Sequence, residues 1–417
     1  MELDAEQHGT DSARASKAET PLRVLLLCDR YPFPLQNGQN LRVWHYVKRL
    51  RTLHRFDLLC HGDGDPPPEL HSLFDVIEQF PPPPVVRRRG LDHVRYGLSV
   101  GRMFPDDPRI RAHLTRILPE RDYDVIWMSG WGMVVNLPDM CFPALLDDIV
   151  DDGVLEYWRE LKRSRSVARV LLIAKWLMMN YRFERYYFGP AAQCLFVSEV
   201  DAATFKRVCP ATPTAVIHNG VDEEHFRPLG LPPEEHTLVF EGRMDFRPNA
   251  DAAISFCREL LPHVRAAIPD ARLKLVGMNP AVDVRALASD AVDVTGHVDD
   301  VRPYLDRARL FICPLRKGAG IKNKILQAWA MGKAVVATPE SVGGLNVQQD
   351  VNIVVRPFGR SLAKAVVDLL NDPARAAALG AAGRRTIINH YTWDQKALEL
   401  DRQLRNVAYR ARSPRNA

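Results

Sequence analysis

The sequence predicts an α/β protein made of two doubly wound domains. Short apolar runs, typical of buried parallel strands, alternate with helical segments along most of the chain. The alternation starts near residue 23 and starts again at residue 237, after a polar, proline-containing segment at 222–236 that we interpret as a linker. A length of 417 residues also exceeds that of one typical domain, so two large domains are expected.

The composition is that of a soluble globular protein, with 46% hydrophobic and 26% charged residues. The net charge of +5 suits anionic substrates or a membrane surface, and it does not by itself indicate nucleic-acid binding. Residues 1–20 are polar and predict a disordered N-terminal tail rather than a signal peptide. Seven cysteines lack paired spacing, and those beside apolar runs predict buried thiols of a reducing, cytoplasmic compartment. These are Cys28, Cys60, Cys194 and Cys313.

The first half begins with the fully apolar run 23–28, which predicts a strand followed by a loop and a helix over 41–53. The loop carries no G-x-G-x-x-G turn, which argues against a single dinucleotide-binding Rossmann domain. Further strands are expected at 56–60, 124–128, 144–146 and 194–197, and a proline-rich loop at 81–84.

The most apolar helical stretch lies at 164–185 and is rich in arginine. Its longest apolar run, 166–180, is interrupted by Arg169 and Lys175 and is shorter than the roughly 18 residues that a spanning helix needs. The pattern predicts a basic amphipathic helix. Two interpretations stay open: a helix whose apolar face packs on the core, or peripheral attachment to an anionic membrane surface, such as the inner face of the cell membrane.

The segment 310–338 is the most informative part of the second half. An apolar strand leads into a basic, glycine-containing loop, which is followed by a helix over 321–331 and a second strand. Free N–H groups and the positive end of the helix dipole favour an anion at such a helix start. A solvated lysine cluster is the alternative, since charge runs are usually exposed. The cations and glycines concerned are Arg316, Lys317, Gly318, Gly320, Lys322 and Lys324.

The spacing within this helix assigns its faces. Ile321, Ile325 and Trp329 recur every four residues and are expected to pack inward. A second face, which we expect to look into a cleft, consists of Gly320, Lys324 and Gln327.

Several segments, taken in order, resemble motifs of the retaining glycosyltransferases of family 4, which have the GT-B fold. The closest likeness is to bacterial sugar transferases associated with exopolysaccharide systems, which carry a D-F-V-D-like segment where this chain has DIVD at 148–151. The likeness covers roughly 22–405. Each motif alone is weak, so the resemblance depends on several motifs that occur in the family's order. The matching segments are 197–205, 216–228 (VIHNGVDEEHFRP), 240–252 (FEGRMDFRPNADA), 294–308, 320–338 and 391–394 (YTWD).

This resemblance implies the GT-B arrangement, in which two Rossmann-like, doubly wound domains face each other across a cleft. An acceptor domain would span 21–221 and a donor domain 237–390, joined by the linker at 222–236, and a final helix at 391–412 would cross back to the first domain. The implied activity is metal-independent transfer of a hexose-type sugar, with anomeric retention. The donor would be a nucleoside-diphosphate sugar and the acceptor a glycan or lipid-linked molecule in polysaccharide biosynthesis. No cofactor and no nucleic-acid partner are implied.

The resemblance also assigns roles to residues of the donor domain. Arg243 corresponds to the family's phosphate-binding arginine, a charge-assisted and often bidentate contact, and otherwise it is a surface arginine of a turn. The lysine that usually follows is absent, so Arg247, Lys322 or Lys324 must supply the second cation, and we favour Lys324. Arg243 and Lys324 are therefore the predicted catalytic residues. The predicted donor contacts are Asn37, Gly38, Asn219, Gly220, Gly242, Gly318, Gly320, Lys322, Asn323 and Gln327.

Three residues are candidates for the acceptor side, namely Asp148, Asp151 and His218. A hydrogen-bonded structural histidine is the other interpretation of His218. The acidic residues at 147–152 suggest either a metal cluster or a strand-end loop with helix N-caps, and we favour the second.

The main departure from the family is Gln327, where related enzymes carry a glutamate that holds the nucleotide ribose, and the family's first glutamate has no acidic counterpart either. An amide still accepts a hydrogen bond from a hydroxyl but loses the charge-assisted part, roughly 1–2 kcal/mol. This leaves room for a non-catalytic, sugar- or partner-binding protein. A nucleotide-sugar epimerase of the same fold is a further alternative, although no acid/base pair for it is identifiable.

Overall fold

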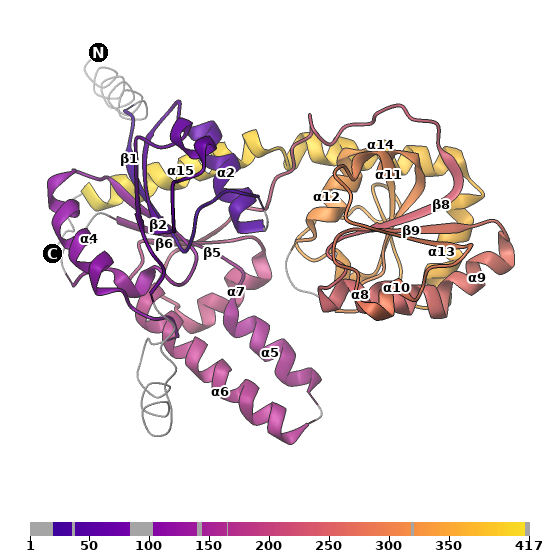
Figure 1. Ribbon diagram of the computed structural model, residues 1–417, viewed down its shortest axis with the longest axis horizontal. Coiled ribbons are helices and arrows are strands. Elements are labelled where there is room, and N and C mark those ends of the chain that lie inside the picture. The colour runs from indigo at the N-terminus through magenta and orange to yellow at the C-terminus, as the bar shows by residue number, and fades with distance from the viewer. Residues whose placement is uncertain are drawn as a thin grey trace, which may run out of the picture. The chain divides into compact units, whose positions relative to one another are not determined.

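The computed structural model describes residues 20–35, 38–83, 103–139, 144–164, 166–317 and 321–412 (Figure 1). The chain divides into two compact units, one formed by Met1–Ile217 with Ala397–Ala417 and the other by His218–Lys396. Each unit contains a fully parallel sheet with helices on its faces (Figure 1). The predicted fold class, two Rossmann-like doubly wound domains, is confirmed. The polar tail predicted at 1–20 lies, apart from its last residue, outside the described residues.

The first unit has a seven-stranded sheet of order β3-β2-β1-β4-β5-β6-β7. Its core strand β1 pairs with β2 on one side and β4 on the other, so the strand order reverses at β1. In an open parallel sheet such a switch point opens a crevice at the carboxyl ends of the strands. The strands are β1 (Arg23–Cys28), β2 (Arg55–His61), β3 (Val76–Phe80), β4 (Val125–Ser129), β5 (Ala144–Val150), β6 (Gln193–Phe196) and β7 (Thr214–Val216).

The helices of the first unit include one that also belongs to the second unit. Helix α15 (Trp393–Arg412) starts in the second unit, and from Ala397 onward it belongs to the first. Two partly buried polar contacts dock it there, between His54 Nε2 and Asp401 at 2.7 Å and from Gln193 Nε2 to Gln403 at 2.6 Å. The other helices are α2 (Gly38–Leu50), η1 (Pro68–Ser72), α4 (Pro108–Glu120), η2 (Val134–Asn136), α5 (Gly153–Arg163), α6 (Val167–Phe183), η3 (Glu184–Phe188) and α7 (Glu199–Val208).

The second unit has a six-stranded sheet of order β10-β9-β8-β11-β12-β13, which places its switch point at β8. The strands are β8 (Glu234–Glu241), β9 (Arg272–Val276), β10 (Val292–Gly296), β11 (Ala308–Cys313), β12 (Ala334–Ala337) and β13 (Val354–Val355). The helices are α8 (Arg247–Ser255), η4 (Phe256–Leu260), α9 (Leu261–Ala267), α10 (Val282–Arg285), α11 (Arg302–Arg307), α12 (Asn323–Ala330), η5 (Pro339–Ser341), α13 (Arg360–Leu370) and α14 (Pro373–His390).

Several predicted boundaries differ from the structure. Strand β8 starts at Glu234, inside the segment expected as a linker, because Glu234 pairs with Ala308 of β11 and forms an ion pair with Lys274 (2.8 Å). The helix expected at 41–53 begins earlier and ends earlier, as α2 (Gly38–Leu50). The unit boundary falls between Ile217 and His218 rather than at residue 221.

The interior of both units is apolar, as the sequence indicated. Cys28, Cys60, Cys194 and Cys313 are buried free thiols, which confirms their predicted burial. In the part of the chain that the structure describes, no helix is long and apolar enough to cross a membrane.

Candidate functional site

The second unit brings two predicted segments to the same edge of its sheet. The turn that follows β8 and the loop that follows β11 both leave the carboxyl end of the sheet, and β8 and β11 are neighbouring parallel strands on the switch-point side. Ligands of doubly wound sheets bind in this position. Helix α12 starts next to it, so its first N–H groups lie at the same edge. These segments therefore form the candidate site.

Lys324 ties α12 to the turn after β8. Its Nζ donates hydrogen bonds to the Glu241 carbonyl (2.7 Å) and to Asn249 Oδ1 (2.8 Å), and it lies 4.5 Å from the centroid of the Phe240 ring. Asn249 Nδ2 in turn donates to the Arg243 carbonyl (2.9 Å). A lysine ammonium has three donors, so one N–H remains for another acceptor. Lys324 thus lies within the predicted site and also holds the backbone that carries Arg243.

Two glycines allow the turn to approach its neighbours closely. Gly242 has φ +145°, and a Cβ placed on it would lie 2.6 Å from Lys324 Nζ and 2.7 Å from Asn249 Nδ2. Gly277, at the end of β9, has φ +147°, and a Cβ there would collide with the Gly242 carbonyl. Only glycine adopts such backbone angles readily, so the sequence at both positions is dictated by the turn.

Arg243 points its guanidinium into solvent rather than into the core. It pairs with Asp245 of the same turn, with 2.9 Å between Nη2 and Oδ2, and its side chain is exposed. An exposed pair of this kind contributes little to stability, so the guanidinium can exchange the carboxylate for a phosphate at small cost.

Glu241 is a buried carboxyl that sequence reasoning missed. It ends β8 next to the turn, and burial raises the pKa of this carboxyl to about 7, although the nearby Lys324 ammonium acts against the shift. Burial likewise lowers the pKa of the half-buried Lys324 ammonium. No local signal marks Glu241 in the sequence, since its burial depends on contacts formed only in the folded unit.

Asn219 and Gly220, two predicted donor contacts, lie beside the start of α12 and the start of α15 respectively. Asn219 Nδ2 donates to Asn323 Oδ1 (3.1 Å), which joins two predicted donor contacts. A Cβ on Gly220 would lie 2.6 Å from Trp393, so that glycine admits the tryptophan of the YTWD segment. His218 lies beside Tyr391, with ring centroids 6.0 Å apart.

The structure describes some of the remaining predicted donor residues but not all of them. Lys322 precedes α12, and Ile325 and Trp329 are buried as the helical spacing predicted. Gln327 is half-buried on the same helix as Lys324. Gly38 opens α2 in the first unit. Asn37, Gly318 and Gly320 lie outside the described residues.

A cationic pocket of about 480 Å³ adjoins the start of α8 and the loop after β11. Its arginines are partly neutralised, because Arg247 pairs with Asp251 (2.9 Å) and Arg316 pairs with Glu259 (3.2 Å). The lining residues are Arg247, Pro248, Asp251, Ile254, Ser255, Arg258, Asp283, Arg316 and Lys317.

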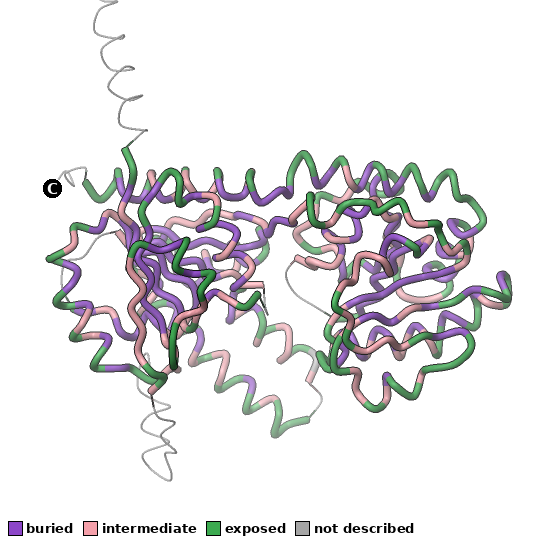
Figure 2. Tube along the Cα trace, turned by 45° about the horizontal axis from the view of Figure 1, so that its top comes forward, coloured by how far each residue is buried: buried purple, intermediate pink, exposed green. Residues whose placement is uncertain are grey.

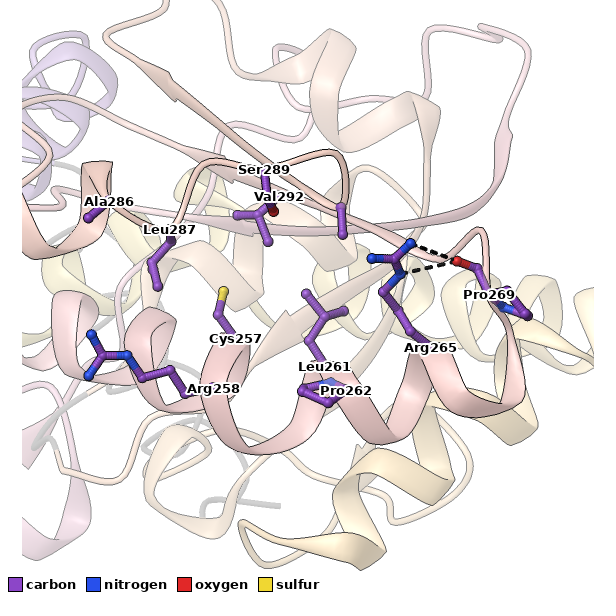
Figure 3. Close-up of a pocket in the computed structure, with 11 residues that line it drawn as sticks. Cys257, Arg258, Leu261, Pro262, Arg265, Pro269, Ala286, Leu287, Ser289 and Val292 are labelled. Carbon is purple, nitrogen blue, oxygen red and sulfur yellow. Dashed lines mark hydrogen bonds between the residues drawn. The ribbon is translucent and has the colours of Figure 1, made fainter.

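A second cavity, of about 550 Å³, lies at the opposite edge of the same sheet (Figure 3). It is lined by η4, α9 and the segment before β10, and Arg265 there donates to the Pro269 carbonyl (3.1 and 3.0 Å). Because this edge holds the amino ends of β9 and β10, it is not where a doubly wound sheet places its ligand.

The acidic residues at the end of β5 do not converge on one point. Asp148 is completely buried and accepts from Arg42 Nε at 2.8 Å, while Arg42 Nη1 also donates to the Ile217 carbonyl (2.7 Å). Asp152 accepts from the Leu155 N–H (2.6 Å) and caps α5, as favoured from the sequence. No group of side chains suited to a metal ion occurs among the described residues.

This arrangement corrects one acceptor-side expectation. Asp148 has no solvent-exposed side-chain surface, so this structure gives it a structural role with Arg42 and no direct access to an acceptor. Asp151 is exposed and stays a candidate. Asp29, which sequence reasoning missed, lies at the carboxyl end of β1, where burial raises its pKa to about 6 and the N–H groups of Gly132 and Met133 act against the shift.

Comparison with known proteins agrees with this architecture. Residues 235–372 match the glycosyl transferases group 1 family. Among curated relatives, the GDP-mannose-dependent alpha-(1-6)-phosphatidylinositol monomannoside mannosyltransferase of Mycobacterium tuberculosis is 28% identical, over 91% of this chain and 97% of its own length. The alpha-maltose-1-phosphate synthase of Mycolicibacterium smegmatis is also 28% identical, over 92% of this chain and 100% of its own length.

Solved structures share the fold along nearly the whole chain. Sucrose-phosphate synthase from Thermosynechococcus elongatus has a TM-score of 0.70 at 20% identity and covers 93% of this chain and 100% of its own. WaaG, a glycosyltransferase of lipopolysaccharide biosynthesis, has a TM-score of 0.61 at 16% identity, with 90% and 99% covered. The group 1 match in the second unit, the full-length relatives and the shared two-sheet architecture together support a glycosyltransferase with the GT-B fold.

Proposed function

We propose that the protein transfers a hexose from a nucleoside-diphosphate sugar to a lipid-linked or glycan acceptor, with retention of the anomeric configuration. The observation that carries this proposal is the Lys324–Asn249–Arg243 connection at the β8 switch point, inside the segment that matches the group 1 family. The relative that uses GDP-mannose and a phosphatidylinositol monomannoside supports GDP-mannose and a mannosylated phospholipid as the first pair to test.

The chemistry requires stabilisation of the departing diphosphate while the sugar carbon becomes electron-poor. Arg243 would exchange Asp245 for a phosphate oxygen, and the remaining N–H of Lys324 would point a second positive charge at the diphosphate. The N–H groups at the start of α12 would add dipoles of the same sign. With fixed cations in these positions, the proposal includes no metal ion.

Gln327 is the reason to expect a low affinity for the nucleotide-sugar donor at this site. As an amide it would accept from a ribose hydroxyl without a charge-assisted contribution, so donor affinity should fall by about tenfold relative to a glutamate. A Gln327→Glu variant with tighter nucleotide binding would support the ribose contact. A non-catalytic protein, the alternative that Gln327 motivates, would bind nucleotide and show no turnover in either form.

The test is a panel of nucleotide sugars, with nucleoside diphosphate release measured with and without mannosylated phosphatidylinositol. We expect acceptor-dependent release, and Arg243→Ala should lower it at least about tenfold, since one charge-assisted phosphate contact is lost. Arg265→Ala is the matched control, because it removes an arginine from the cavity at the other edge of the sheet. If Arg265→Ala loses nucleoside diphosphate release and Arg243→Ala keeps it, the donor binds in that cavity instead.

Product analysis separates transfer from the other chemistries. Proton NMR of the glycosylated product should show the anomeric configuration of the donor, and an inverted product would contradict the retaining proposal. An epimerase would instead convert the free nucleotide sugar without any acceptor, which chromatography of the sugars after acid hydrolysis would reveal.

A further inference from the structure

Helices α5 and α6 form a hairpin whose second helix exposes an apolar surface. The two helices pack against each other along their length and extend from the sheet of the first unit (Figure 1). Much of α6 is coloured as exposed or intermediate in Figure 2. Large contiguous apolar surfaces are uncommon on soluble proteins and usually mark an interaction site.

Most exposed apolar residues of α6 follow helical spacing along a single face, and Leu172, 54% exposed, lies off that face. Val167, Leu171, Ala174, Met178 and Tyr181 are separated by four, three, four and three residues, which aligns them on one side of the helix. Val167 is 77% exposed, Leu171 67% and Met178 59%. We call these five residues the apolar stripe.

The apolar stripe is not the face that packs on the protein. Ile173, Asn180 and Phe183 are the buried residues of α6, and they lie on the opposite side of the helix. The helix is therefore apolar on two faces, one packed on its own unit and one exposed. An apolar face of a helix is normally covered. Its own unit covers one side only.

Cations accompany the apolar stripe, and acids are absent from the helix. Arg169, Lys175 and Arg182 are the only charged residues in Val167–Phe183, and Arg169 lies on the other side of the helix from the stripe, where it pairs with Glu160 of α5 at 2.7 Å. Helical spacing places Lys175 and Arg182 along one edge of the stripe. Arg185, just beyond the helix, lies over the Tyr181 ring at 5.9 Å from its centroid. The partner must therefore offer an apolar layer bordered by negative charge.

We infer that the apolar stripe docks on the surface of an anionic phospholipid bilayer, with α6 lying in the plane of the headgroups. The apolar side chains would enter the boundary with the acyl chains, while Lys175, Arg182 and Arg185 would contact headgroup phosphates. A second copy of this chain fits less well, because it would bring the same cations face to face. The inference does not depend on the donor chemistry proposed above.

Flotation of the full-length protein with vesicles tests this inference. Vesicles of phosphatidylcholine and phosphatidylglycerol in equal parts should carry the protein, and neutral phosphatidylcholine vesicles should carry much less. Leu171→Glu with Met178→Glu should weaken binding at least about tenfold, because two carboxylates enter the apolar stripe. Lys175→Gln should weaken binding to the anionic vesicles about fivefold and leave neutral vesicles unaffected.

Val200→Glu is the matched control, since it places the same charge at a 52% exposed apolar position on α7 and should bind as the wild type does. Equal binding of wild type and Leu171→Glu/Met178→Glu would overturn the inference, and so would equal binding to neutral and anionic vesicles. Analytical ultracentrifugation adds another outcome: if the double variant turns a dimer into a monomer and keeps its vesicle binding, the stripe is a self-association face instead. Transfer to a water-soluble acceptor can be intact in every case, so failure here leaves the proposed function standing.

Discussion

Lys324 of α12 donates a 2.8 Å hydrogen bond to Asn249 of α8, joining two helices that are 75 residues apart in the chain. Asn249 Nδ2 in turn donates a 2.9 Å hydrogen bond to the Arg243 carbonyl oxygen. The backbone that carries the exposed guanidinium is thus linked, through Asn249, to a lysine on α12. Lys324 acts on the candidate site through this connection whether or not its third N–H reaches the donor.

Breaking the Lys324–Asn249–Arg243 connection should weaken donor binding while leaving both cations present. In Asn249→Ala the Arg243 carbonyl loses a partner and Lys324 loses an acceptor, a cost of about 1–3 kcal/mol. We expect KM for the nucleotide sugar to rise by about tenfold, because the turn is no longer held. Steady-state kinetics measures it, with Lys324→Met for comparison. If Asn249→Ala keeps the wild-type KM, the connection has no positioning role.

Gly242→Ala should disrupt the same turn sterically. The new Cβ would lie 2.6 Å from Lys324 Nζ, and φ +145° is a region that only glycine adopts without strain. We expect a loss of about 2–3 kcal/mol in the free energy of unfolding and a larger relative loss of transfer activity. Chemical denaturation and donor kinetics measure the two effects. Gly343→Ala is the control, since a Cβ there meets nothing within 4 Å, and a comparable loss in it would refute the steric explanation.

Glu241 should make the stability of the second unit depend on pH. Its folded-state pKa of about 7 lies above its ordinary value of 4.5, so the folded state binds the proton more tightly than the unfolded state does. Stability should therefore fall as pH rises from 4.5 to about 7, by up to about 3 kcal/mol, and then level off.

Glu241→Gln removes this titration, so the variant should be more stable than the wild type above pH 7 and should show a flatter profile. Urea denaturation across the pH range measures the difference. The exposed Glu340→Gln is the control and should follow the wild-type profile. Parallel profiles for wild type and Glu241→Gln would mean that the carboxyl is not buried as the structure shows.

The buried Arg42–Asp148 pair should behave as a unit. Arg42→Met leaves an uncompensated carboxylate with no exposed surface, and we expect it to cost about 3–5 kcal/mol in the free energy of unfolding. Asp148→Leu should cost a similar amount, and the double variant should cost clearly less than the sum. Urea denaturation of all three gives the coupling energy. The exposed Asp63→Asn should stay within about 0.5 kcal/mol, and additive costs for Arg42 and Asp148 would contradict the pairing.

Those features that depend on local pattern were predictable. The alternation of apolar runs and helices predicted two parallel-sheet domains, because a buried parallel strand is apolar on both faces whatever covers it. The burial of Ile325 and Trp329 followed from helical spacing, and the cap at Asp152 followed from its place after a strand. Prediction of β8 was less accurate at its start, where Glu234 extends the strand through contacts with residues far along the chain.

The amino-acid sequence by itself determined the fold class and the segments that carry the candidate donor site, because periodicity and glycine placement act within a few residues. Only the tertiary structure decided what those side chains do. Lys324 became a residue that holds the Arg243 turn, and Asp148 became the buried partner of Arg42, 106 residues away. The apolar stripe of α6 is likewise recognisable only from the tertiary structure, which shows which face of that helix is packed and which is exposed. Burial, and with it charge state and accessibility, depends on contacts between distant segments that no local pattern records.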